Sequence, residues 1–196
     1  MTLLQAFILG AVQGLTEFLP VSSSGHLILV PAFFGWPTHP VAFDAMIHLG
    51  TLCAVVYALR DDVKRIAVGL VRGDSLGRVG WLIALGTIPT LFVGFLLSEV
   101  FAVDLRSPTL VAAMLAAWGI LLWLADRAVK SGATDDIRKL SWKQAIVVAL
   151  VQVFSLIPGT SRSGATITAG LFAGLDRATA ARRGGNSSVP VRRRQE

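Results

Sequence analysis

The 196-residue sequence is 54% hydrophobic, and only 15% of its residues are charged, whereas soluble domains carry about 25%. Glu17 is the only Asp, Glu, Lys or Arg before Asp44, so the composition excludes an ordinary soluble globular protein. The net charge of +6 suggests nucleic acid as an alternative partner. Basic residues of membrane proteins usually mark cytoplasmic loops, however, and we therefore expect no nucleic-acid partner.

Residues 2–35 form the first apolar segment, which is interrupted by Pro20 and by the run of residues 22–25, SSSG. Neither half reaches the length of about 20 residues that a helix needs to cross a bilayer. The segment predicts a re-entrant helix-loop-helix whose polar turn lies near the midplane. Backbone of this kind is tolerated only where protein or water satisfies it.

Three uninterrupted apolar runs follow, each long enough for a transmembrane helix, at residues 41–59, 79–98 and 108–125. Five basic residues lie between the first two runs and five more at 126–143, but the 99–107 connection has only Arg106. By the positive-inside rule, the two basic connections and the arginine-rich C-terminus are cytoplasmic, and 99–107 is outside. The sequence predicts a multi-pass membrane protein.

Residues 142–175 repeat the design of the first segment, with a break at Pro158 and a polar turn before the next apolar half. At an offset of 139 residues, three residues of the first segment recur in the second: Gln5 as Gln144, Gln13 as Gln152 and Gly25 as Gly164. Such a recurrence, begun from the opposite side of the bilayer, is an inverted repeat. The predicted fold is all-α: a polytopic membrane protein with an inverted-topology repeat and two re-entrant helix-loop-helix segments.

The expected domain organisation is a single integral membrane domain over residues 1–183, followed by a disordered basic tail at 184–196. Repeat one covers 2–125, and an incomplete repeat two covers 142–183. A complete second repeat would add three further spans, so we expect the chain to be truncated. Residues 1–196 alone are then expected to be inactive or strongly impaired, because re-entrant backbone needs enclosure by protein.

Gln13 and Glu17 are the first candidate functional residues. They are four residues apart and share one face of a helix. A carboxylate in an apolar segment is costly unless it is paired, hydrated or bound to a cation, which favours a functional role. The alternative is a structural hydrogen bond between helices.

Polar residues of the first turn form a second candidate group: Ser22, Ser23, Ser24, Gly25 and His26. Hydroxyl and backbone N–H groups at a helix N-terminus are suited to phosphate oxygens. His26 is three residues after Ser23, close enough to act as a base toward a serine nucleophile or as an acid toward its leaving group. Helix capping by the serines and an ordinary hydrogen bond of the histidine are the alternatives.

The second turn adds Ser161, Arg162 and Ser163, with Thr166 one helical turn later. The planar guanidinium of arginine suits phosphate bidentately, although a structural ion pair between Arg162 and Glu17 is an alternative. If the two turns meet, they form one anion-handling site with room for a cation. Asp44 and His48 could line the same cavity or pair with each other, and we leave them out of the site.

Two stretches closely resemble the signature motifs of the bacterial undecaprenyl-diphosphatase, or bacitracin-resistance, family: residues 13–26, QGLTEFLPVSSSGH, and residues 158–166, PGTSRSGAT. The resemblance runs from about residue 2 to Arg182. Members of this family are phosphatases of the bacterial inner (plasma) membrane. They remove one phosphate from undecaprenyl diphosphate and so regenerate the lipid carrier for peptidoglycan and other envelope polymers.

The resemblance implies a role for each candidate residue. Gln13, where many members have Glu, and Glu17 would support a divalent cation, Mg²⁺ or Ca²⁺, or the diphosphate. Ser23 resembles the proposed nucleophile and His26 its acid/base partner, although spacing does not decide which serine attacks. Arg162 would grip phosphate together with the neighbouring Ser161, Ser163 and Thr166.

The implied partners are a polyprenyl diphosphate lipid and the bilayer, and the oligomeric state is left open, with a homodimer as one candidate. A lipid-phosphate carrier that flips its substrate without hydrolysis is the competing hypothesis, because inverted repeats with broken helices are typical of secondary transporters. Transport does not need the Ser23 and His26 pair, which favours the enzyme.

Overall fold

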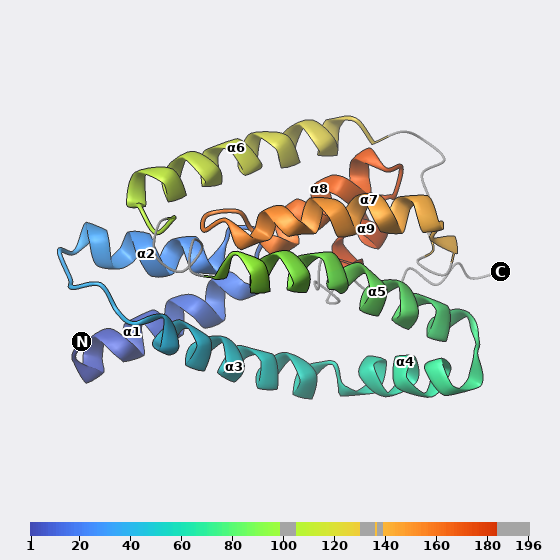
Figure 1. Cartoon of the computed structure of the whole chain (residues 1–196), viewed down its shortest axis with the longest axis horizontal. Helices are drawn as coiled ribbons and strands as arrows, with labels where there is room; N and C mark the ends of the chain where they lie inside the picture. Colours follow the sequence, from blue (N-terminus) through green and yellow to red (C-terminus); the bar gives the residue numbers. More distant parts are fainter. Residues whose placement is uncertain (99–104, 130–135, 137–138, 184–196) are drawn as a thin grey trace.

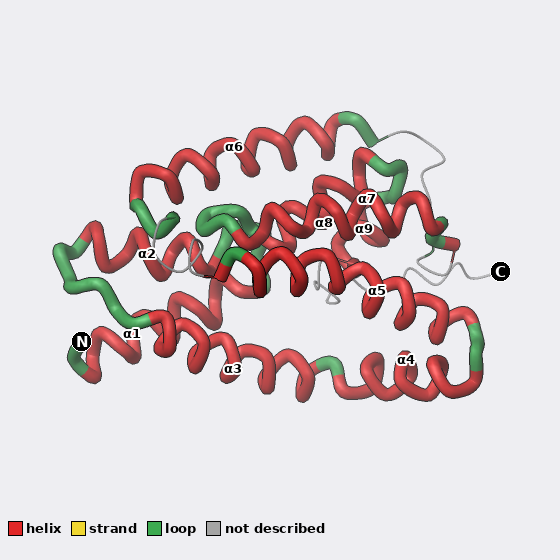
Figure 2. The backbone as a smooth tube through the Cα atoms, viewed as in Figure 1, coloured by secondary structure: helices red, strands yellow, loops and turns green. Residues whose placement is uncertain are grey.

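The computed structural model describes residues 1–98, 105–129, 136 and 139–183. Within these ranges the regular elements are helices, with no strand among them (Figure 2), which confirms the all-α prediction. The helices are α1 (Leu3–Glu17), α2 (Ser23–Phe33), α3 (Val41–Ala58), α4 (Arg60–Arg72), α5 (Ser75–Leu96), α6 (Pro108–Arg127), α7 (Trp142–Gln152), a 3-10 helix (Val153–Leu156), α8 (Arg162–Phe172) and α9 (Arg177–Arg183).

Most of the helices run along the long axis of the molecule (Figure 1). Helices α3 and α4 follow one another along the lower edge of this view, and α5 returns beside α4. Helices α7 and α8 pack against each other, with α5 against α7 and α6 against α8. Helices α1 and α2 pack together at the end of the molecule that holds the N-terminus, and α2 also contacts α6.

Helices α3, α5 and α6 are each long and apolar enough to cross a membrane, as expected of the three predicted spans; that they cross the membrane stays a prediction. Helix α5 begins at Ser75, four residues before the predicted start at residue 79. The reason is a cap: Asp74 Oδ1 accepts the N–H groups of Leu76 and Gly77, both at 2.9 Å, and so satisfies donors that a helix N-terminus leaves free.

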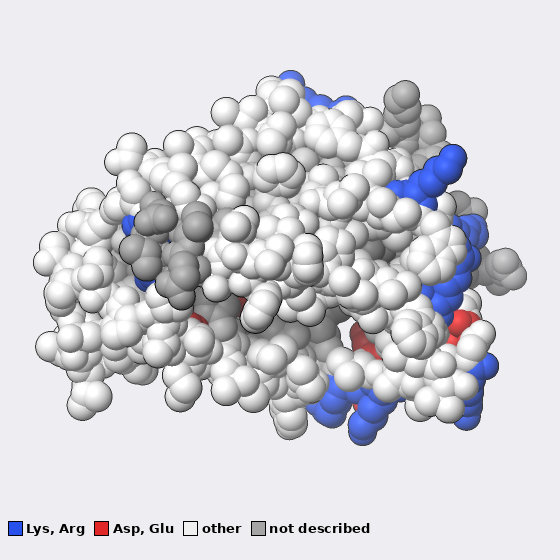
Figure 3. All heavy atoms as spheres, in the orientation of Figure 1, with Lys and Arg blue, Asp and Glu red and all other residues white. Residues whose placement is uncertain are grey.

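Much of the basic connection between the first two spans is helix α4. Gly73 ends this helix in the left-handed conformation, with φ of +69°, which glycine adopts at little cost. In Figure 3, Lys and Arg atoms lie mainly toward the side of the view that holds α4 and the end of α5 near it, while uncharged residues cover most of the middle of the face. Many large apolar side chains on the three spans are exposed, as expected of helices that face lipid.

The two interrupted segments have matching helix bounds. Helix α1 covers residues 3–17, and α7 with the 3-10 helix covers 142–156; α2 covers 23–33, and α8 covers 162–172. Every one of these bounds is displaced by 139 residues. Capping boxes begin both segments, Thr2 with Gln5 and Ser141 with Gln144. The opposite orientation of the two segments in the membrane and their re-entrant paths stay predictions.

Candidate active site

The loops that follow α1 and the 3-10 helix lie against each other. Ser163 Oγ donates a hydrogen bond to the carbonyl oxygen of Leu19 across 3.4 Å. Close by, a Cβ atom on Gly25 would lie 3.3 Å from Gly159 Cα. The structure therefore brings the two polar turns into direct contact, although they are far apart in the sequence.

Gly159 is required for this contact. Its φ is +93°, and a Cβ atom at this position would lie only 2.6 Å from the Val111 carbonyl oxygen of α6. We expect Gly159→Ala to cost about 2 kcal/mol or more, seen as a lower melting temperature of the purified protein in detergent. Gly119→Ala is the matched control, because nothing lies within 4 Å of that Cβ position. Equal melting temperatures for the two variants would contradict the prediction.

Glu17 connects the end of α1 with the start of α2. Its Oε2 accepts hydrogen bonds from Gln13 Nε2 at 2.9 Å and from Ser23 Oγ at 2.6 Å. A serine hydroxyl that donates to a carboxylate keeps its lone pairs free for attack, and the carboxylate is placed to accept its proton. Three of the predicted site residues thus form one hydrogen-bonded group.

His26 lies one turn into α2 and is held by the backbone. Its Nδ1 is 2.8 Å from the Ser22 carbonyl oxygen, which can only accept, so Nδ1 carries the hydrogen of this bond. The remaining Nε2 is the atom that gains or loses a proton. Among the residues that the structure describes, Ser23 Oγ is bonded to Glu17 and not to His26, so Glu17 is the group placed to act as base toward Ser23.

The serines of both turns are partly used as helix caps. The Ser22 hydroxyl accepts a hydrogen bond from the N–H group of Gly25 at 3.3 Å, and the Ser161 hydroxyl accepts one from Gly164 at 3.1 Å. Both bonds match the capping alternative. Ser24 Oγ lies 3.3 Å from Ser22 Oγ, and Ser163 Oγ lies 3.1 Å from Ser161 Oγ. Ser22 has a φ of +61°, a conformation that is rare for a side-chain-bearing residue and typical of functional sites.

Thr166 is buried in α8, and its hydroxyl is turned toward its own helix. Oγ1 lies 2.9 Å from the Arg162 carbonyl oxygen and 3.1 Å from that of Ser163. These acceptors take up the hydroxyl hydrogen, which a phosphate oxygen would also need. The structure thus shows the Thr166 hydroxyl bonded to its own helix, and its contact with phosphate stays a prediction.

Arg162 is the first residue of α8 and its side chain is exposed. It forms no ion pair with any residue in the described part of the chain, so the alternative of a structural pair with Glu17 is not seen there. A guanidinium without a counterion at a helix N-terminus favours an anion, because the helix dipole adds to its positive charge.

Thr51 of α3 also reaches this group, and the sequence interpretation did not include it. Gln13 Nε2 donates to Thr51 Oγ1 across 3.4 Å. Thr51 follows Asp44 by seven residues and His48 by three, so the three polar residues share one helix face. That periodicity places Thr51 on the polar face of α3, but it does not predict the contact with Gln13.

Asp44 is the centre of a separate polar cluster at the start of α3. Its Oδ1 lies 2.6 Å from His39 Nε2, and its Oδ2 lies 2.7 Å from Arg106 Nη1. His48 Nδ1 bonds the backbone oxygen of Asp44 at 2.7 Å. The pairing of Asp44 with His48 that the sequence left open is therefore made through the Asp44 backbone oxygen. The Asp44 carboxylate instead contacts His39 and Arg106, which the sequence analysis did not assign to it.

Comparisons with known proteins identify the family of this chain. The profile of the family described as Bacitracin resistance protein BacA matches residues 6–191. The chain belongs to this family. Undecaprenyl-diphosphatases of Teredinibacter turnerae and Marinobacter nauticus are 43% and 45% identical to it, over 97% of this chain and 74% of each relative. The undecaprenyl-diphosphatase of Chlorobaculum tepidum is 46% identical, over 93% of this chain and 69% of the relative.

A divalent cation fits this BacA-family site through oxygen atoms. The described residues contain no group of three or more His, Cys, Asp or Glu side chains that could hold a metal. Gln13, however, is fully buried, and its Oε1 has no hydrogen-bond partner within the described ranges. An orphan amide oxygen beside a carboxylate suits Mg²⁺, which is often held by one or two protein oxygens together with water and substrate phosphate.

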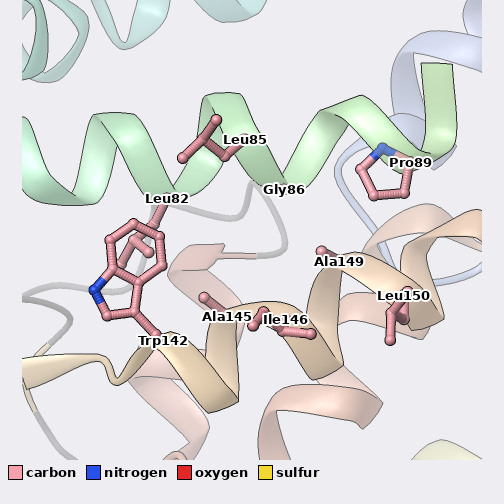
Figure 4. Close-up of a pocket in the computed structure, with 9 residues that line it drawn as sticks. All are labelled: Leu82, Leu85, Gly86, Pro89, Trp142, Ala145, Ile146, Ala149 and Leu150. Atoms are coloured by element: carbon pink, nitrogen blue, oxygen red, sulfur yellow. The ribbon is translucent and has the colours of Figure 1, made fainter. Parts of the chain in front are cut away.

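An apolar groove between α5 and α7 lies elsewhere in this BacA-family protein (Figure 4). Its volume is about 130 Å³, and its lining includes Leu82, Pro89 and Trp142. None of the predicted site residues line it. A groove of this composition accommodates hydrocarbon and offers little to a phosphate group.

Proposed function

We propose that this chain hydrolyses undecaprenyl diphosphate to undecaprenyl phosphate and inorganic phosphate, and that the reaction takes place where the two loops meet. The hydrogen bond of 2.6 Å between Ser23 Oγ and Glu17 is the main support, because it pairs a nucleophile with a base. Family membership and the names of the relatives support the same reaction. The product would return to envelope synthesis, and its recycling would confer resistance to bacitracin.

The proposed reaction has two steps. Ser23 Oγ attacks the terminal phosphorus while its proton passes to Glu17, and the bond from that phosphorus to the bridging oxygen breaks. His26 donates a proton from Nε2 to the bridging oxygen of the leaving undecaprenyl phosphate. Water then attacks the phosphorus of the phosphoserine while its proton passes to His26 Nε2. Glu17 returns its proton to Ser23 Oγ, so that inorganic phosphate is released and the serine, Glu17 and His26 regain their starting states.

Arg162 is proposed to bind the oxygens of the terminal phosphate as charge develops on them, the kind of contribution that is often the largest in catalysis. Gln13 Oε1 and the second carboxylate oxygen of Glu17 are the proposed protein ligands of a divalent cation. When bound, Mg²⁺ or Ca²⁺ would neutralise charge on the diphosphate.

The proposal includes the location of the protein. The uncharged spans and the basic connections support a multi-pass protein of the bacterial inner membrane, with α4 on the cytoplasmic side. The lipid substrate would come from the bilayer. We retain a homodimer as a candidate oligomeric state, and we propose no nucleic-acid partner.

Sealed liposomes that contain the chain and a polyprenyl diphosphate test the proposed function. We expect released inorganic phosphate, measured with enzyme in excess over lipid so that slow turnover is detected. Movement of the lipid between leaflets without phosphate release would instead identify a carrier.

A further inference from the structure

The amide of Gln13 is held in one orientation by two acceptors. Nε2 has two hydrogens, and its two partners are Glu17 Oε2 at 2.9 Å and Thr51 Oγ1 at 3.4 Å. A carboxylate can only accept, so the nitrogen end of the amide must face it. With both hydrogens used on Nε2, the oxygen end of the amide has no hydrogen-bond partner among the described residues.

Thr51 acts here as an acceptor because its own hydrogen is used elsewhere. Thr51 Oγ1 lies 2.9 Å from the His48 carbonyl oxygen and 3.3 Å from that of Ile47, one turn earlier in α3. A hydroxyl that donates to its helix backbone presents only lone pairs to Gln13. Thr51 therefore distinguishes the two ends of the amide.

We propose that Thr51 is a positioning residue, which fixes the Gln13 amide so that Oε1 is available to a divalent cation. Oε1 is fully buried and without a partner among the described residues, so it lacks the ligand that its burial calls for. Without Thr51, one N–H of the amide would lose its acceptor, and the oxygen end would be less firmly held. This inference rests on the cation that forms part of the proposed function.

The proposed role of Thr51 matters only if residue 13 is glutamine. An amide has one nitrogen and one oxygen end, and only the oxygen binds a cation. A glutamate at this position has two equivalent oxygens and needs no such orientation. The effect of Thr51 on cation binding should therefore depend on whether residue 13 is Gln or Glu.

A double-mutant cycle with Thr51→Val and Gln13→Glu tests the proposal. Binding of Mn²⁺, as a spectroscopic probe for the cation, is measured on the whole purified chain in detergent without substrate. Thr51→Val should weaken binding about tenfold in the Gln13 chain, a loss typical of groups that orient metal ligands. The same change should cost less than about threefold in the Gln13→Glu background. Thr51→Ser keeps the hydroxyl and should restore binding.

Thr87→Val is the matched control, because Thr87 Oγ1 also donates to a carbonyl of its own helix, that of Ile83 at 2.8 Å, outside the site. An equal loss from Thr51→Val in both backgrounds, no loss in either, or the same binding by Thr51→Ser and Thr51→Val would overturn the proposal. If the unmodified chain releases phosphate but binds no Mn²⁺, the phosphatase function stands and the role of Thr51 fails. If Mn²⁺ binds as expected but no phosphate is released, hydrolysis fails instead.

Discussion

Replacing Arg162 with alanine should lower the rate of phosphate release about a thousandfold. Arg162 is exposed at the start of α8 and has no ion pair among the described residues, so its charge is available to the transferred phosphate. Loss of a single group that stabilises developing negative charge costs about 10²–10³ in rate. The measurement is the single-turnover rate of phosphate release from a polyprenyl diphosphate in detergent.

Two further variants make this result specific. Arg162→Lys keeps the charge but loses the planar pair of donors, and its rate should lie between those of the unmodified chain and the alanine variant. Arg177→Ala is the matched control, because Arg177 is an exposed arginine whose guanidinium is already paired with Asp126. Near-normal turnover by Arg162→Ala would remove this residue from the mechanism.

Replacing Ser23 with alanine should have a still larger effect, a loss of about 10⁴-fold or more, as expected when a nucleophile is removed. Ser23 is the serine bonded to Glu17. Ser24 is its neighbour, and its hydroxyl lies 3.3 Å from that of Ser22. We expect Ser24→Ala to lose less than about tenfold. The same single-turnover assay measures both, and a larger loss for Ser24→Ala would assign the attack to the other serine.

The fold follows from the sequence wherever apolar length decides it. The three long runs predict α3, α5 and α6, and the breaks at Pro20 and Pro158 predict the two helix pairs. Helix α4 was not predicted, because its charged residues were interpreted only as a connection. Val63, Ile66 and Leu70 recur at the spacing of one helix face, a pattern that would have predicted the helix, and the structure packs α4 against α5.

The site was predictable where its residues share a helix. Gln13 and Glu17 are one turn apart, and their hydrogen bond follows from that spacing. The bond from Ser23 to Glu17 spans a turn that passes through Ser22 in a left-handed conformation, and helical periodicity does not predict its path. The contact of Thr51 with Gln13 depends on how α3 packs against α1, which no local pattern encodes.

The displacement of 139 residues between the two helix pairs has a consequence for the orientation of a substrate in the proposed site. Position 23 in the first pair corresponds to position 162 in the second, so the same helix N-terminus presents a hydroxyl on one side and a guanidinium on the other. Glu17 corresponds to Leu156, so the carboxylate has no counterpart. The two similar halves thus supply different chemical groups to the proposed site. Under the proposed function, a diphosphate between them would meet chemically different walls and would be bound in one orientation.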